Sequence, residues 1–208
     1  YNTNSRALTY INTNTNTYID PATGQAMSGP PLSKTFNKDS EDASLKYRIA
    51  PGVIAYLRYA RGFRTGNYNT YVATTSDFNL YNPEELTDYE GGIKARVWGG
   101  KAQLNLSGFH YNYDNMQVTI LQNTGTHTTN AAQAVSNGFE FEGQVRPLQN
   151  LFGSFGVTYQ DAHYTNYKND SAPTPFNGGN PVDLSGQPLE RAPHVTANFL
   201  LSYKIPVF

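Results

Sequence analysis

Residues 88–113 read DYEGGIKARVWGGKAQLNLSGFHYNY, and this stretch decides the fold. From Tyr89 to Val97 the odd positions are apolar or small, while the even positions are mostly charged. A period of two places these two sets on opposite faces of a β-strand. A Gly-Gly pair at 99–100 follows, and glycine supplies the positive φ angles that a tight hairpin needs. The stretch therefore predicts a β-hairpin with one apolar and one polar face.

The same alternation recurs along the chain, in segments about as long as a tilted strand needs to cross a bilayer. It predicts strands at residues 6–11, 44–49, 53–59, 89–97, 102–111, 139–145, 151–159 and 195–205. Short turns between them alternate with long polar connections at residues 12–42, 62–83, 122–136 and 164–192. An antiparallel meander with short turns at one end and long loops at the other is typical of bacterial outer-membrane barrels. A soluble β-sandwich also alternates, but it does not usually sort its loops by length.

The alternation changes parity after Gly108, where Phe109, Tyr111 and Tyr113 occupy the odd positions. Either a β-bulge lies there, or the strand leaves the apolar zone and no longer needs to alternate. The second interpretation is favoured because residues 102–111 already reach about a membrane-crossing length.

Composition narrows the possible functions. The 208-residue chain has a net charge of −1, which gives no general attraction to nucleic acid, so no nucleic-acid partner is expected. It contains no cysteine, which excludes disulfide frameworks and thiolate metal sites. No run of 18 apolar residues is present, so the sequence predicts no transmembrane helix.

Four stretches resemble the barrel of TonB-dependent receptors, and they come in the order found in that family. They read YARGFRTGNYN at 59–69, NPEELTDYEGGIKARVWGGKAQLNLSGFHYNYDNMQV at 82–118, NAAQAVSNGFEFEG at 130–143 and PLERAPHVTANFLLSYKIP at 188–206. Each stretch alone is a weak signal, whereas their common order makes the set specific.

The resemblance implies an all-β antiparallel meander that forms about 8 of the 22 strands of a plugged transmembrane β-barrel. Residues 1–208 would then be a fragment of a single barrel domain, without the plug domain and the terminal strands. It implies a Gram-negative outer-membrane receptor, not an enzyme, that takes up a ferric siderophore. Its partners would be outer-membrane lipid, the siderophore, and the TonB protein through a segment absent here. No cofactor is implied.

Two other classes of function stay open on the residues alone. Eight strands are able to close into a small barrel, which would make the protein a passive outer-membrane channel. A soluble carbohydrate-binding or enzymatic β-domain is the other alternative. No catalytic residue is predicted, because Glu84, Glu85 and Asp88 do not define the carboxylate separation that glycoside hydrolysis requires.

The two faces of the strands assign most candidate site residues. The polar set would face the lumen, either as part of a transport path or, as we favour, as a wall that pairs charges across strands. It consists of Glu90, Lys94, Arg96, Glu140, Glu142 and Arg146. The apolar set would face lipid, and it consists of Ile93, Ala95, Val97, Phe139, Phe141 and Val145.

Aromatic residues have two possible roles. The candidates for stacking on a ligand are Tyr68, Tyr71, Phe78 and Tyr81 in the second loop and Tyr164 and Tyr167 in the fourth. Arg64 adds a donor fork for an anionic group, and His127 is a further loop candidate, although no pair of histidines has metal-ligand spacing. The tyrosines near strand ends are instead expected in the interfacial aromatic girdle; these are Tyr59, Tyr111, Tyr113 and Tyr159.

Overall fold

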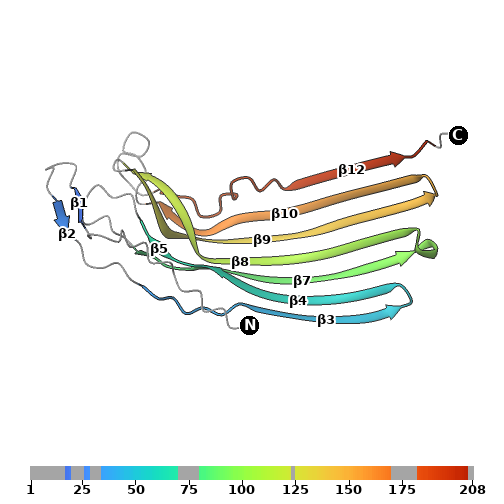
Figure 1. The fold of residues 1–208 in the computed structure, drawn as a ribbon, viewed down its shortest axis with the longest axis horizontal. Helices are drawn as coiled ribbons and strands as arrows, with labels where there is room; N and C mark the ends of the chain where they lie inside the picture. The colour runs from blue at the N-terminus through green and yellow to red at the C-terminus, as the bar shows by residue number, and fades with distance from the viewer. Residues whose placement is uncertain are drawn as a thin grey trace.

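A curved, eight-stranded antiparallel sheet makes up most of the computed structural model (Figure 1). The structure describes residues 17–19, 26–28, 34–69, 80–122, 125–169 and 182–205. The long strands are β3 (Glu41–Ala50), β4 (Val53–Arg64), β7 (Glu84–Val97), β8 (Ala102–Gln122), β9 (Gly125–Leu148), β10 (Leu151–Asn169) and β12 (Val195–Tyr203). Each pairs with its neighbour along the chain, in the order β3, β4, β7, β8, β9, β10 and β12. Within the described residues no helix has the length and apolar character to span a membrane.

Short strands gather at one end of the sheet, which is called the loop end below (Figure 1). They are β1 (Thr17–Ile19) with β2 (Ala26–Ser28), β5 (Asn67–Tyr68) with β6 (Leu80–Tyr81), and β11 (Val182–Asp183), which pairs with the last residues of β10. The predicted connection 12–42 thus contains β1 and β2, and the predicted strand 6–11 lies outside the described residues. The other seven predicted strands are confirmed.

Tight turns occupy the opposite end, called the turn end. Gly52 has φ +80°, Gly99 and Gly100 have φ +61° and +85°, and residues 149–150 join β9 to β10. Trp98 also adopts a positive φ, +55°, and begins a one-turn 3₁₀ segment, Trp98–Gly100. The predicted Gly-Gly hairpin is therefore confirmed, and all three turns lie at the same end of the sheet (Figure 1).

The register separates the side chains into two faces. On one face apolar residues align in rows across β7 to β10, such as Ile93, Leu106, Phe141 and Val157. This apolar face carries all six residues of the predicted apolar set. The opposite, polar face carries Glu90, Lys94, Arg96, Glu140, Glu142 and Arg146.

The change of parity in β8 involves no bulge at Gly108. The ladder between β7 and β8 is unbroken from Glu85–Asp114 to Val97–Ala102. Phe109, Tyr111 and Tyr113 therefore lie on the polar face, as expected for a strand that has left the apolar zone. The expectation that Tyr111 and Tyr113 join an outward girdle was wrong, whereas Tyr59 and Tyr159 do lie on the apolar face.

The predicted third loop, 122–136, was also wrong. β8 and β9 continue as a paired hairpin up to Gln122 and Gly125, so strand replaces almost all of that loop. Its Asn and Gly residues are poor strand formers, but its Thr residues favour strands and the partner strand supplies a full ladder. The hairpin still projects at the loop end (Figure 1).

The sheet is open. Among the described residues β3 pairs only with β4, and β12 pairs only with β10. Every residue of β3 and of β12 is exposed. An edge strand leaves a row of unpaired backbone groups, so these strands do not form the small closed barrel considered above.

With only one layer, the sheet packs by laying large side chains over small neighbours. The ring of Tyr56 on the polar face covers Gly92, where an added Cβ would lie 2.8 Å from Cε1 of Tyr56 and 2.6 Å from the carbonyl oxygen of Leu106. Tyr56 also donates a hydrogen bond to Glu90, and Nζ of Lys94 lies 5.1 Å from the centre of its ring. Glycine at position 92 is thus required by space, as in strands where an aromatic ring packs on glycine.

Replacing Gly92 by alanine should destabilise the full-length protein by about 1–3 kcal/mol, the usual cost of overpacking. Gly108→Ala is the matched control, because its nearest contact, the carbonyl oxygen of Gly138, would be an ordinary 3.7 Å away. Urea unfolding in detergent measures both variants. Equal stabilities for the two would show that the Tyr56 ring moves aside at no cost.

Candidate functional site

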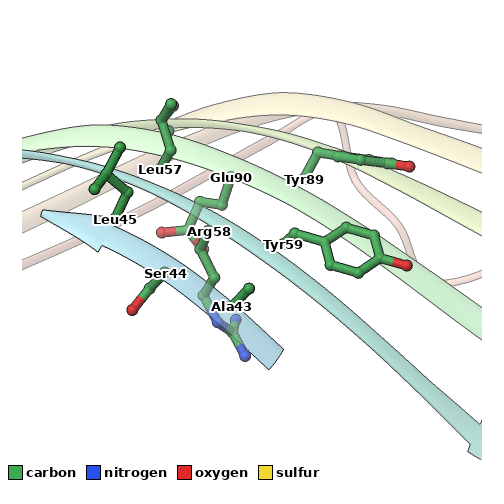
Figure 2. Close-up of a pocket in the computed structure, with 9 residues that line it drawn as sticks. Ala43, Ser44, Leu45, Leu57, Arg58, Tyr59, Tyr89 and Glu90 are labelled. Carbon is green, nitrogen blue, oxygen red and sulfur yellow. The ribbon is translucent and has the colours of Figure 1, made fainter. Parts of the chain in front are cut away.

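A groove lies on the apolar face of the sheet, at the end that begins with β3. It has a volume of about 550 Å³ and lies across β3, β4 and β7. Figure 2 shows Leu45 and Leu57 at one end and Tyr59 and Tyr89 at the other. The small residue Gly91 forms part of its floor. Its side chains are largely apolar, so it lacks the converging polar groups of a specific ligand site.

A second surface, on the polar face at the loop end, is richer in chemistry. Five aromatic side chains from β8 and β10 share this region. We call Phe109, Tyr111, Tyr113, Tyr164 and Tyr167 the aromatic surface. Small residues of β9 and β10 lie between them, and four of these are buried: Ala132, Ala134, Ser136 and Ala162.

The β8 half of the aromatic surface is held by stacking. The rings of Phe109 and Tyr111 are nearly parallel, with 4.6 Å between their centres. Phe109 lies over Gly138 of β9, where an added Cβ would come within 2.5 Å of its ring. Phe109 is therefore fixed from two sides, and Tyr111 rests on it.

The β10 half depends on an irregularity in the ladder. Tyr164 and Tyr167 are three residues apart, so a regular strand would place them on opposite faces. The register shifts between Tyr164 and Asn166, and both tyrosines then align with Ala134 and Ala132 of β9. Their ring centres are 4.9 Å apart. A β-bulge thus turns the second ring onto the polar face.

We call residues 89–97 of β7, together with the residues aligned with them on the neighbouring strands, the apolar band. Tyr164 and Tyr167 of β10 lie beyond this band. Tyr164 is half-buried and Tyr167 is buried. Burial raises the pKa of Tyr164 and of Tyr167, and the neighbouring Tyr167 adds to the effect on Tyr164. Both phenols are therefore protonated at neutral pH. Each is able to donate a hydrogen bond and to present a ring face to a ligand.

A chain of charges adjoins the aromatic surface. Nη1 of Arg58 donates to Oδ2 of Asp88 at 3.0 Å, and its Nη2 donates to Oδ2 of Asp42 at 2.8 Å. Asp88 is only 7% exposed, and its Oδ1 has no hydrogen-bond partner among the described residues. Asp88 pairs in register with Tyr111. The polar face therefore has an unpaired acceptor next to the aromatic surface.

Ion pairs fix the strands where the loops begin. Nε of Arg64 lies 3.0 Å from Oε1 of Glu84. Glu85, one residue along, forms ion pairs with both Lys38 and Arg61. Glu85 and Arg61 lie on the apolar face but beyond Tyr89, hence outside the apolar band. These pairs tie the segment before β3 to β4 and β7.

The structure places the predicted ligand residues as follows. Arg64 is exposed and already engaged by Glu84, so its donor fork is only partly free. Tyr68 lies in β5 at the base of its loop, and Tyr167 is in the aromatic surface. The backbone of His127 pairs with Ile120 in the β8–β9 hairpin. Tyr71 lies outside the described residues.

Of the sequence candidates, the structure brings Tyr164 and Tyr167 into the aromatic surface. The sequence did contain a signal for Phe109, Tyr111 and Tyr113, namely their change of parity after Gly108. Their position near a strand end led instead to the prediction that Tyr111 and Tyr113 join the girdle. No local sequence pattern predicts the β-bulge that places Tyr167 on the polar face.

Comparison with known proteins places the chain in a family context. A family model described as TonB dependent receptor-like, beta-barrel matches residues 4–207. The metal-pseudopaline receptor CntO of Pseudomonas aeruginosa strain UCBPP-PA14 is 30% identical over 125 residues. That alignment covers 59% of this chain but only 16% of the receptor.

Two solved structures share the fold. The ferric yersiniabactin uptake receptor FyuA of Yersinia pestis superposes with a TM-score of 0.70 and 17% identity, over 89% of this chain and 26% of that chain. The ferripyoverdine receptor of Pseudomonas aeruginosa gives 0.57 and 16%, over 88% and 22%. The chain therefore spans about a quarter or less of the length of the proteins it matches.

The Glu85 ion pairs give a prediction on pH. The hydrogen bond from Lys38, and then that from Arg61, hold the pKa of Glu85 below its ordinary value, and burial only partly opposes them. A lowered pKa stabilises the fold above the ordinary carboxylate pKa, and this contribution is lost as the pH falls through the lowered value. Glu85→Gln should cost about 1 kcal/mol at pH 7, a modest value because both cations are partly exposed.

The difference between wild type and Glu85→Gln should vanish in acid. Urea unfolding of the full-length protein at pH 7 and at pH 3 measures it. Glu142→Gln is the control, because Glu142 forms no ion pair within the described part of the chain. A deficit of Glu85→Gln that persisted unchanged at pH 3 would contradict the assignment.

Proposed function

Because the chain belongs to the TonB-dependent receptor-like β-barrel family, we propose that it is part of a receptor for uptake of a ferric siderophore. Proteins of this family reside in the outer membrane of Gram-negative bacteria, and this is the location of the chain. The family is one of receptors and transporters rather than of enzymes. The observation that carries the proposal is the aromatic surface at the loop end of a barrel-type sheet.

We place the apolar face against lipid. On β7 the apolar residues run from Tyr89 to Val97, a length that crosses the hydrocarbon core when the strand is tilted. The groove between β3, β4 and β7 would then be filled by acyl chains, which accounts for its apolar lining. Tyr59 and Tyr89, whose ring centres lie 5.4 Å apart, would mark the outer interface.

We place the polar face toward the lumen. Glu90, Lys94, Glu140 and Glu142 would then form a hydrated wall, together with the hydroxyl of Tyr56 that is bonded to Glu90. Loops at the mouth and a polar wall below it suit a passage for a polar solute. The loop end would face the outside of the cell, and the turn end would face the periplasm.

The two open edges favour a larger barrel. An unpaired backbone group in lipid costs several kcal/mol, so β3 and β12 require further strands as neighbours. The chain spans only about a quarter of the solved receptors that it resembles. We therefore propose that residues 1–208 form part of one barrel domain, which encloses a plug and receives energy from TonB through segments outside this chain.

The aromatic surface suits capture of a metal chelate. Ring faces stack on flat organic chelators, and the neutral phenols of Tyr164 and Tyr167 donate hydrogen bonds to their oxygens. The relatives named above bind pseudopaline, yersiniabactin and pyoverdine complexes according to their names. These ligands are metal complexes of small organic molecules, which supports the same class for this chain.

The assignment of faces can be tested with spin labels on single cysteine variants of the full-length protein in bilayers. Labels at positions 93 and 141 should be accessible to oxygen, which partitions into lipid. Labels at positions 94 and 142 should be accessible to a water-soluble nickel complex. The opposite pattern would reverse the two faces.

Uptake tests the function. Cells that lack the gene should lose uptake of ⁵⁵Fe(III) supplied in spent medium from iron-starved cultures, and the full-length gene should restore it. Uptake of ⁶⁵Zn(II) from the same medium should not change. Zinc uptake that depended on the gene while iron uptake did not would change the proposed metal, and no effect on either would refute the proposal.

Tyr164→Ala should raise the concentration of iron complex needed for half-maximal uptake by about three- to tenfold, the loss of one aromatic contact. Tyr59→Ala, on the opposite face, is the control and should leave that concentration unchanged at equal surface expression. An unchanged value for Tyr164→Ala would move the ligand site away from the aromatic surface.

A further inference from the structure

One glutamine joins the two ends of the long connection between β4 and β7. Nε2 of Gln117 donates to the carbonyl oxygen of Thr65 at 3.0 Å and to that of Asn82 at 2.9 Å. Its backbone N–H donates to Oε2 of Glu84 at 2.8 Å, and Glu84 in turn pairs with Arg64. Gln117 therefore bridges the residue that follows β4 and the residue that follows β6.

Asn130 completes this bridge from the neighbouring strand. Its Nδ2 donates to the carbonyl oxygen of Asn82 at 2.9 Å and to that of Asn115 at 2.7 Å, and its Oδ1 accepts from the N–H of Asn82. The backbone of Asn82 is thus bound in both directions by one side chain, as it would be by a strand. Gln117 and Asn130 are register partners in the β8–β9 ladder, so a single cross-strand pair supplies both amides.

Close packing narrows the connection above the bridge. Gly66 is buried, and an added Cβ would lie only 2.1 Å from the carbonyl oxygen of Tyr81. Asn67 and Tyr68 then pair with Tyr81 and Leu80 as β5 and β6. Residues 65–68 and 80–82 therefore pack against each other, and we call these two segments the neck.

A third amide ties the same connection to β9. Nδ2 of Asn69 donates to the carbonyl oxygen of Thr128 at 2.9 Å, and the N–H of Thr128 donates to its Oδ1 at 2.7 Å. Asn69 is buried. The connection is thus attached to the β8–β9 hairpin at its neck and just above it.

We propose that Gln117 and Asn130 are positioning residues for ligand capture, because they hold the neck closed and fix Tyr68 at the mouth of the barrel. This inference rests on the proposed function and adds residues that touch no ligand. A loop that is only partly ordered binds with an affinity reduced by the ordered fraction. Opening the neck should therefore weaken binding even though the aromatic surface is intact.

The neck itself is tested without any ligand. Hydrogen exchange of residues 65–82 in the detergent-solubilised full-length protein should be faster in Gln117→Ala and in Asn130→Ala than in the wild type. Gln133→Ala is the matched control, because this glutamine of β9 donates only one long hydrogen bond, 3.4 Å to Asp114. Exchange in Gln117→Ala equal to that of the control would overturn the proposal.

Binding is tested with ⁵⁵Fe(III) in spent medium from iron-starved cultures, on whole cells with equal surface expression. Gln117→Ala should raise the apparent dissociation constant about tenfold, and Gln133→Ala should not. A disulfide between cysteines at Asn67 and Tyr81, which are register partners, should restore binding in the Gln117→Ala background and lose this effect on reduction. The 208-residue chain has no cysteine of its own to interfere.

The outcomes separate the two proposals. Weak binding of Gln117→Ala that the disulfide does not restore would make Gln117 a direct ligand contact and overturn the positioning role. If the wild-type protein bound no iron complex, the proposed function would be refuted. Faster hydrogen exchange in Gln117→Ala would still show that Gln117 holds the neck closed.

Discussion

The structure depends on the regular pairing of backbone N–H and C=O groups between neighbouring strands, which the proposed position in lipid requires. An antiparallel ladder achieves this pairing only if the register is regular, and between β7 and β8 it is unbroken from Glu85 to Val97. A regular ladder fixes the side-chain period at two. From that period follow the apolar face, the polar face and the position of every charged residue in the band. In a single-layer sheet the packing partner of a side chain comes from a neighbouring strand. The ring of Tyr56 on β4 accordingly packs over Gly92, its register partner on β7.

The sequence predicts well wherever this constraint applies and poorly where it ends. The alternation located seven of the described strands, the turns at the turn end and both faces, because in the band each residue must satisfy lipid or water. Beyond the band neither face is forced to be apolar. There the position of Tyr111 and Tyr113 near a strand end wrongly predicted the girdle, and the polar composition of residues 122–136 wrongly predicted a loop. The contacts of Gln117 and Asn130 could not be predicted from the sequence either, because no local pattern marks a side-chain amide that binds backbone groups far away in the chain.

The register shifts of the long ladders lie near the two ends of the strands. Those between Arg48 and Ala50 and between Leu151 and Gly153 adjoin the tight turns. The β8–β9 register shifts near Met116, and the β9–β10 register shifts near Asn166, both toward the loop end. A bulge leaves a backbone group unpaired, which side chains and water can satisfy there. Asn115 shows the first solution, since its carbonyl oxygen accepts from Asn130. The features proposed to capture ligand, Tyr167 in one case and the neck in the other, both follow from these shifts.

The neck also gives a physical reason why separate stretches of this sequence resemble one family. Arg64 and Thr65 lie within the first of those stretches, Asn82 and Glu84 lie at the start of the second, Gln117 lies near its end, and Asn130 begins the third. All six residues meet in one network of hydrogen bonds and an ion pair. Such a network is not easily changed one residue at a time, because removing one member leaves a polar partner unsatisfied. Because each of the six residues satisfies a partner on another strand or connection, the network favours keeping all six together.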